Sequence, residues 1–523
     1  MTTTGERALV QTGDVPAPIE LPAALVTTLT NWFDDQNLVT PSINYAVFDR
    51  GGVIFQHGVG EFQLDGRAPQ LDTIYRIASM SKSFEMAAIL VLVEQGLLSL
   101  DDLVSTHVAE FADPVDEFGV PSPVTVRMLM SNSSALPEDN GWADHELGLS
   151  RADFLAVIGR GLHFAGTPGF GYQYSNIGFW LLGVIVENVS GVTFEEFATS
   201  TLLEPLGLTD TRYSVGDYPA TDEQRIARGY GTFDEGATWF DRPVVGTGIG
   251  GCAASMFSTV SDIATWSAWL SSAFDVENPD DTVLSRASRR LMQRIHTSMP
   301  AAADRPVEPQ LEGIGYGLGL VVENDVRFGL IAQHSGGLPG WSSNMRWHQE
   351  SGIGVVVFAN TNGVKPGIAA AGMLRAVLET IEPPAREIAL WPQTVSAATA
   401  IDDAIFAGAD LAGAISPNLL SPDLLSPNLL SDVPADVRAA RLAKLVDEVG
   451  GLTLSAAPIA SRLLWTTSEA HVAWVIPGTN GDLEARIELT PTEPPMLQRL
   501  EIERRTAVTA LSSVIRHYRP VVF

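Results

Sequence analysis

The stretch RIASMSKSFEMAAILVLVEQGLL, residues 76–98, places a serine and a lysine three positions apart at the head of an apolar run. The run predicts a helix that Gly96 ends, because glycine readily follows a helix C-terminus. Lysine occurs in the chain only as Lys82, Lys365 and Lys444, and arginine supplies the other basic side chains. A buried lysine can lose its proton, whereas arginine stays charged. This pattern predicts that Lys82 stands where a proton must move.

Ser79 and Lys82 share one face of the predicted helix, because residues three apart on a helix are neighbours. Ser79 would lie in the first turn, where free N–H groups and the helix dipole favour a developing anion. A desolvated lysine can exchange a proton with a nearby hydroxyl. The structural alternative is a capping serine with a solvated lysine. Phe84 and the run Ala87–Ile89 make the helix apolar on most sides, which favours the buried lysine.

A second polar cluster, GYQYSNIGFW at 171–180, precedes another apolar helix that Gly191 closes. A tyrosine beside a cationic lysine can have its pKa lowered, so Tyr174 is a candidate base. Asn176 offers both a donor and an acceptor to a substrate amide. The cluster is therefore a candidate partner of the Ser79 helix.

A third cluster, AQHSGGLPGW at 332–341, places His334, Ser335 and Gly336 at the end of a predicted strand. Glycines at such a position let a ligand approach the backbone closely. A free N–H group of this strand could complete an oxyanion hole with that of Ser79.

The order of predicted elements indicates an α+β fold. Two alternating runs around Arg50–Gly52 predict a hairpin, and four strand-like runs follow between residues 316 and 362. Strands at both ends with helices between them predict one antiparallel sheet built from the two ends of a domain. We expect a first domain at 1–390, a linker at 391–434 that contains the repeat SPNLLSPDLLSPNLL, and a small α+β domain at 435–523.

Composition excludes several classes of function. The net charge of −30 and the lack of a basic stripe argue against a nucleic-acid partner. Cys252 is the single cysteine, so no internal disulfide is expected. No signal peptide is visible, and the longest apolar run is too short to span a membrane. The remaining histidines lack metal-ligand spacing. We expect a soluble cytoplasmic protein with no metal and no cofactor.

The three clusters, in this order, resemble the penicillin-recognising serine hydrolases, whose β-lactamases and penicillin-binding proteins carry a Ser-x-x-Lys signature. The Tyr-x-Asn motif resembles the class C β-lactamase branch, which also contains D-aminopeptidases, DD-carboxypeptidases and esterases. The resemblance covers roughly residues 40–380 and implies a sandwich of sheet and helices beside an all-helical region, with the site between them. Its flanking segments are TIYRIASMSKSF (73–84), VTVRMLMSNSSALP (124–137), GTPGFGYQYSNIGFWLLG (166–183), LLEPLGLTDT (202–211) and HSGGLPGWSS (334–343).

The resemblance assigns roles to residues of the first two clusters. It implies that Ser79 is the nucleophile and that Lys82 and Tyr174 transfer protons. It also implies that Asn176 holds the substrate amide and the lysine. An ester or amide carbonyl attacked by Ser79 would then form an acyl-enzyme that water hydrolyses.

On the strand, the resemblance implies a substrate-binding segment of His334, Ser335, Gly336 and Gly337, with the Gly337 N–H as the second oxyanion donor. His334 stands where β-lactamases have a lysine, and a neutral imidazole offers a β-lactam carboxylate less charge. A second departure is the segment Asn132–Leu136, which reads Asn-Ser-Ser-Ala-Leu where the family often has His-Thr-Ser-Gly-Leu. We expect Asn132 and Ala135 to act on the site only through other residues.

The sequence therefore predicts a serine hydrolase that cleaves an amide or peptide bond of a small molecule or short peptide, such as a D-amino-acid derivative. An esterase of the same fold is the nearest alternative. A catalytically silent protein that binds a peptide or cell-wall fragment is an alternative of another class. The scissile bond, the preferred stereochemistry, the oligomeric state and the role of the C-terminal domain stay open.

Overall fold

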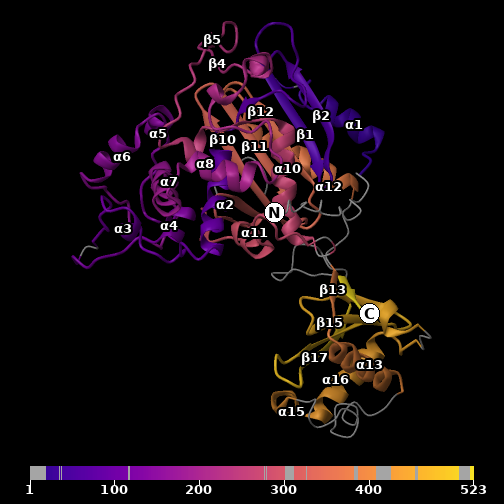
Figure 1. The fold of residues 1–523 in the computed structure, drawn as a ribbon. Helices are drawn as coiled ribbons and strands as arrows, with labels where there is room; N and C mark the ends of the chain where they lie inside the picture. Colours follow the sequence, from indigo (N-terminus) through magenta and orange to yellow (C-terminus); the bar gives the residue numbers. More distant parts are fainter. Residues whose placement is uncertain are drawn as a thin grey trace, which may run out of the picture. The chain divides into compact units, whose positions relative to one another are not determined.

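The computed structural model describes residues 19–522, apart from 35, 37, 116–117, 276, 278, 301–310, 326, 382–386, 408–425, 454–456 and 506–518. The chain divides into two compact units, 1–383 and 384–523 (Figure 1). This division falls before the predicted boundary at residue 390. The reason is that β13 (Glu387–Ala389) pairs with β18 (Arg519–Val521). Helix α13 (Pro392–Phe406), in the predicted linker, also packs with the second unit.

An eight-stranded antiparallel sheet forms the centre of the first unit, in the order β2-β1-β12-β11-β10-β9-β8-β7. The pairing of β1 with β12 joins the two ends of this unit, as predicted from the order of elements. The strands are β1 (Ser42–Asp49), β2 (Gly52–Gly60), β7 (Thr297–Ser298), β8 (Leu311–Tyr316), β9 (Val321–Asp325), β10 (Gly329–Leu338), β11 (Trp341–His348) and β12 (Gly354–Ala359).

Both faces of the sheet are covered, which explains why β1, β11 and β12 are buried along their whole length. Helices α1 (Ala23–Thr30) and α12 (Pro366–Ile381) lie on one face. Helix α10 (Val260–Ser271) packs on β1 and β12 from the other. Of these strands β12 shows the continuous apolar run GVVVFA that burial on both faces favours, whereas β11 buries polar side chains such as Asn344 and Arg346.

A helical region adjoins the α10 face of the sheet (Figure 1). Its central helices are α2 (Ser81–Glu94) and α7 (Asn176–Ser190), which pack on each other and on the short α9 (Gly251–Ala254). All of α2 from Ser81 to Leu92 is buried. The other helices are α3 (Val104–His107), α4 (Val126–Met130), α5 (Asn140–Glu146), α6 (Arg151–Ile158), α8 (Phe194–Ala198) and α11 (Arg286–Met292).

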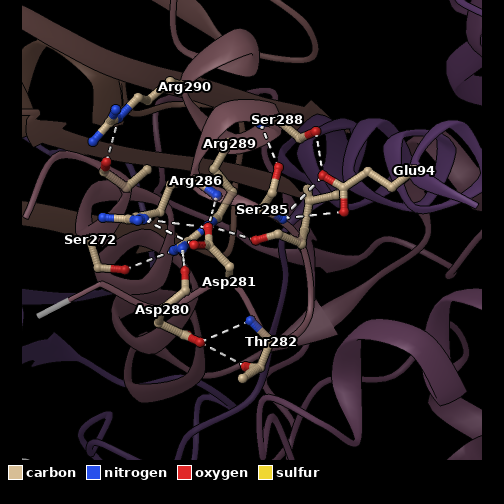
Figure 2. Close-up of polar contacts among 12 residues, drawn as sticks. Glu94, Ser272, Asp280, Asp281, Thr282, Ser285, Arg286, Ser288, Arg289 and Arg290 are labelled. Carbon is tan, nitrogen blue, oxygen red and sulfur yellow. Dashed lines mark hydrogen bonds and ion pairs between the residues drawn. The ribbon is translucent and has the colours of Figure 1, made fainter.

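Polar contacts with α11 hold the C-terminal end of α2 (Figure 2). Glu94 accepts hydrogen bonds from the Ser285 N–H (3.1 Å) and the Ser288 hydroxyl (2.6 Å). The fully buried Arg289 guanidinium donates to Ser272 Oγ at 2.7 Å and to backbone carbonyls of Trp269, Asp280 and Leu284. The Glu94 contacts join the far end of the helix that carries Lys82 to the start of α11, and the satisfied donors of Arg289 allow its cation to be buried in the same cluster.

Two short two-stranded pairs complete the first unit: β3 (Tyr75–Arg76) with β6 (Phe257–Ser258), and β4 (Tyr230–Gly231) with β5 (Phe240–Asp241). The first pair leads directly into Ser79. Among the described residues no single helix combines the length and apolarity needed to cross a bilayer. The segments 176–190 and 194–203 reach that length only as a pair bent by 76°.

The second unit is α+β, as predicted, with a four-stranded sheet in the order β14-β15-β16-β17. Trp474 and Ile487 of this sheet pack with Ile401 of α13. Residues 416–425 of the repeat lie outside the described residues. The elements are β13 (Glu387–Ala389), α15 (Pro427–Asp432), α16 (Ala435–Glu448), β14 (Leu463–Trp465), β15 (His471–Ile476), β16 (Leu483–Leu489), β17 (Leu497–Arg504) and β18 (Arg519–Val521).

Candidate active site

Ser79 lies in a single 3-10 turn, Ala78–Met80, immediately before α2. The backbone N–H of Ile77 donates to Met256 O at 2.9 Å, which ties this turn to β6. Ala78 takes the left-handed conformation with φ 50°, which costs an alanine about 1–2 kcal/mol. Ala78 and Met80 are buried, whereas Ser79 keeps partial exposure. The turn therefore presents the serine from an otherwise buried strand-to-helix connection.

Lys82 is fully buried, and its Nζ atom contacts three oxygens. They are Asn176 Oδ1 at 2.8 Å, Ser79 Oγ at 3.2 Å and the Ala253 carbonyl at 3.3 Å. Burial lowers the pKa of Lys82 to about 8, against the opposing influence of the Glu85 carboxyl on the same helix. Its burial agrees with its place in an apolar helix, and the lowered pKa favours loss of the Lys82 proton near pH 8.

Tyr174 adjoins both residues. Its hydroxyl interacts with the Ser79 side chain, and Lys82 Nζ lies 5.1 Å from the centre of its ring. Burial raises the pKa of Tyr174 well above 10, and the contact with Ser79 only partly opposes this effect. The prediction that a neighbouring lysine lowers this pKa is wrong in direction, because desolvation of the phenolate, and then the nearby carboxyl groups of Asp144, Asp139 and Glu85, raise it. Tyr174 is a protonated phenol at neutral pH.

Asn176 begins α7, and its side-chain amide is held on both sides. Nδ2 donates to Asp139 Oδ1 at 3.0 Å and to Asn140 Oδ1 at 2.8 Å. Oδ1 therefore faces Lys82. Asp139 and Asn140 were not identified from the sequence. Their signal, a polar pair at the N-terminus of the short helix α5, is common to many N-terminal helix turns.

The ring of His334 on β10 is enclosed, with 4% of the residue exposed. Nδ1 lies 2.7 Å from the Ser335 carbonyl, which only accepts, so Nδ1 carries the proton. Nε2 then accepts from the Tyr316 hydroxyl at 3.0 Å. Burial, followed by the charge of Lys82, lowers the pKa of His334 to about 3. The imidazole is neutral and both of its nitrogens have protein partners.

Gly336 brings β10 against the Ser79 turn. A Cβ at this position would lie 2.1 Å from Ile77 O and 2.3 Å from Ser343 Oγ, so no side chain fits there. The side chain of Ser335, the preceding residue on β10, points to the opposite face of the sheet. There its hydroxyl oxygen accepts a hydrogen bond from Asn344 Nδ2 at 2.9 Å. The structure therefore brings Ser79, Lys82, Tyr174, Asn176, His334 and Gly336 together but directs the Ser335 side chain elsewhere.

Gly337 is exposed and lies on a free edge of the sheet. Pairing of β10 with β9 ends at Gln333, while pairing with β11 continues to Leu338. Leu338 and Trp341 flank a two-residue turn and form a hydrogen-bonded pair. From this pair outward, non-hydrogen-bonded and hydrogen-bonded pairs alternate along β10 and β11. Gly337 falls in a non-hydrogen-bonded pair with Ser342, so its N–H points to the free edge. This position suits a donor to a substrate oxygen.

Asn132 and Ala135 shape the loop that faces Tyr174. Asn132 Oδ1 accepts from the Ser175 N–H at 3.2 Å, and its carbonyl accepts from the Gln173 N–H at 2.9 Å. Both residues have positive φ, 54° and 64°. Asparagine tolerates this conformation, whereas alanine is strained in it. Among the described residues no group of three or more metal-ligand side chains is present.

Comparison with known proteins places this geometry in a family. The family model Beta-lactamase matches residues 31–378. Penicillin-binding protein 4* of Bacillus subtilis is 27% identical over 56% of the chain and 62% of its own length. Protein flp of Staphylococcus aureus is 28% identical over 62% of the chain and 60% of its length. The chain thus spans somewhat under two thirds of these relatives.

Solved structures share the fold at lower identity. An octameric penicillin-binding protein homologue from Pyrococcus abyssi superposes with a TM-score of 0.56 at 20% identity, covering 92% of this chain and 98% of that one. A D-stereospecific amidohydrolase from Streptomyces sp. gives a TM-score of 0.52 at 21% identity, covering 67% of this chain and 98% of that one. At this level of identity the likeness concerns the fold.

Proposed function

Because the chain belongs to the beta-lactamase family, we propose that it is a serine hydrolase that cleaves an amide or peptide bond through an acyl-enzyme on Ser79. The observation that carries this proposal is the surroundings of Lys82. A neutral lysine amine has two N–H groups and one lone pair. The Asn176 and Ala253 oxygens can accept both N–H groups, which leaves the lone pair for the Ser79 hydroxyl at 3.2 Å.

In the acylation step, Ser79 Oγ attacks the substrate carbonyl carbon while its proton passes to Lys82 Nζ. The N–H groups of Ser79 and Gly337 stabilise the oxyanion. As the C–N bond breaks, the Tyr174 hydroxyl gives its proton to the leaving nitrogen and regains one from Lys82. Water then attacks the acyl-enzyme along the reverse proton path and releases the acid. The Ser79 proton thus ends on the leaving amine, and one proton of the water restores the Ser79 hydroxyl while the remaining O–H stays on the acid.

The substrate class rests on His334 and on the relatives. A neutral, enclosed imidazole supplies no cation for a β-lactam carboxylate. Relatives named as a penicillin-binding protein and, for the fold, a D-stereospecific amidohydrolase support amide substrates. We therefore propose small peptides or D-aminoacyl amides as substrates, turned over faster than β-lactams.

The test has two parts. A fluorophosphonate probe should label the wild-type protein and miss Ser79→Ala, with Ser83→Ala in the adjacent helix α2 as the buried-serine control. A panel of D- and L-aminoacyl anilides, p-nitrophenyl esters and a chromogenic cephalosporin then ranks substrates by kcat/KM. Equal labelling of wild type and Ser79→Ala would place the nucleophile elsewhere. A cephalosporin or an ester at the head of the ranking would overturn the amide assignment, and an inert panel would favour a binding protein.

A further inference from the structure

Asp139, which precedes α5, holds the N-terminal turn of α7 with both carboxylate oxygens. Oδ1 accepts from the Asn176 backbone N–H at 2.7 Å and from Asn176 Nδ2 at 3.0 Å. Oδ2 accepts from the Ile177 N–H at 2.8 Å and the Ser175 hydroxyl at 3.0 Å. A carboxylate at a helix N-terminus is stabilised by such N–H groups and by the helix dipole. Four bonds from three consecutive residues leave this carboxylate little freedom.

These contacts determine which way the Asn176 amide points. Its two N–H bonds are taken by Asp139 and Asn140, so Oδ1 is left for Lys82. A flipped amide would place an oxygen against the Asp139 carboxylate and a second donor against Lys82 Nζ. Both of these contacts are repulsive, because an ionised carboxylate only accepts and an amide nitrogen only donates.

Lys82 depends on this orientation. Asn176 Oδ1 is the nearest of its three oxygen contacts and holds Nζ within reach of Ser79. Loss of that acceptor would leave one buried N–H group of the Lys82 amine without a hydrogen-bond partner. This loss costs free energy in a site that excludes water. Small displacements of a catalytic group lower rates steeply.

Resting on the function proposed above, we propose that Asp139 is a positioning residue, which fixes the Asn176 amide and through it the place of Lys82 beside Ser79. The carboxylate acts on the lysine through a neutral intermediary rather than by direct contact. This role differs from that of an ordinary helix cap, because it should change the properties of Lys82 as well as the stability of α7.

The charged and titratable groups around Lys82 come from every element packed against it. They are Glu85 on α2, Asp144 on α5, Tyr174 before α7, Cys252 on α9 and His334 on β10. The pKa of Asp144 is raised to about 6, chiefly by burial. Comparisons are therefore made above pH 7, where Asp144 stays ionised.

Because the chain has only three lysines, Lys82 can be observed directly. Protein grown with lysine carrying ¹³C at Cε should show three methylene signals, and Lys82→Arg identifies one of them. In Asp139→Asn the midpoint of the Lys82 titration should move to lower pH, and by more than in an Asn176→Ala background, because an unheld Asn176 amide no longer keeps Oδ1 against the ammonium. The control Thr193→Ala removes the N-cap of α8 and should leave this midpoint unchanged.

The rate at which the fluorophosphonate probe labels Ser79 gives the second readout. Asp139→Asn should lower the fluorophosphonate labelling rate above pH 8 by about tenfold to a hundredfold. In an Asn176→Ala background the same substitution should change the rate less than twofold, because the residue it acts through is gone. Thr193→Ala should lose thermal stability without losing labelling rate.

Two results would overturn the proposal. In the first, Asp139→Asn loses stability but keeps the labelling rate and the Lys82 midpoint, which would make Asp139 a helix cap alone. In the second, Asp139→Asn slows labelling equally with and without Asn176. Failure of the proposed function looks different: wild-type protein would not be labelled at all, while the nuclear magnetic resonance titration of Lys82 would still decide the positioning role.

Discussion

Lys82 donates a 2.8 Å hydrogen bond to Oδ1 of Asn176, although the two residues are 94 positions apart in the chain. The contact crosses from α2 to α7, the two central helices of the helical region. It keeps a fully buried amine within 3.2 Å of the Ser79 hydroxyl.

The first prediction concerns the pH dependence of Ser79. Burial lowers the pKa of Lys82 to about 8, and only the neutral amine can accept the serine proton. The labelling rate of Ser79 should therefore rise about tenfold per pH unit below pH 8 and level off above it. Lys82→Arg should be nearly as damaging as Lys82→Ala, because a guanidinium does not give up its proton.

Lys365→Arg is the matched control, since Lys365 is exposed and lies outside the site. It should keep the wild-type rate and pH profile. A Lys82→Arg protein that keeps most of its labelling rate would show that Lys82 acts as a fixed charge.

The second prediction concerns stability below neutral pH. Burial lowers the pKa of His334 to about 3, while a histidine in an unfolded chain titrates near 6.5. Between these values the unfolded chain binds a proton that the folded protein does not. Stability therefore falls as the pH falls, by about 1.4 kcal/mol per unit for this residue.

His334→Gln removes this titration. The stability difference between wild type and variant, measured by urea unfolding, should shrink by roughly 2 kcal/mol between pH 6.5 and pH 5. The other titrating groups contribute to the free energy of unfolding of both proteins, and these contributions cancel in the difference. A difference that stays constant over this range would mean that His334 takes up its proton in the folded state.

The third prediction concerns the strained loop beside Tyr174. Ala135 has φ 64°, a conformation that costs an alanine about 1–2 kcal/mol but is free for glycine. The greater conformational entropy of glycine in the unfolded chain offsets about 0.4–1 kcal/mol of the relieved strain. Ala135→Gly should therefore stabilise the protein by roughly 0.5–1 kcal/mol. Ala24→Gly on the exposed side of α1 should instead destabilise it by about 1 kcal/mol. Equal destabilisation by both would mean that the loop carries no strain at Ala135.

The fourth prediction concerns the second unit. Among the described residues, the hydrogen-bond partners of Ser79 and Lys82 come from the first unit, which ends at residue 383. A chain ending there should fold, and its Ser79 should react with a small fluorophosphonate as the full chain does. The same chain with Ser79→Ala is the control. A truncated protein with a native circular dichroism spectrum but no labelling would show that the second unit contributes to the catalytic centre.

Local patterns were sufficient for much of the fold. Helix α2 follows from the apolar run after Ser79, and the β1–β2 hairpin from two alternating segments around Gly51. Each depends on interactions between residues close in sequence, which periodicity records. The short strands β7 and β8 and the extent of α13 were missed, because two to six residues leave little periodicity and because a proline-rich context favoured a linker.

The sequence by itself determined that Ser79 and Lys82 face the same way, because a helix makes neighbours of residues three apart. Only the tertiary structure decided what these residues can do. Asp139 and Asn140 meet Asn176 across 36 or 37 residues, and the ring of His334 is closed by Tyr316 from another strand. The pKa of Tyr174 rises rather than falls, because it depends on how completely distant segments exclude water. Desolvation is a property of the packed chain, and no local pattern encodes it.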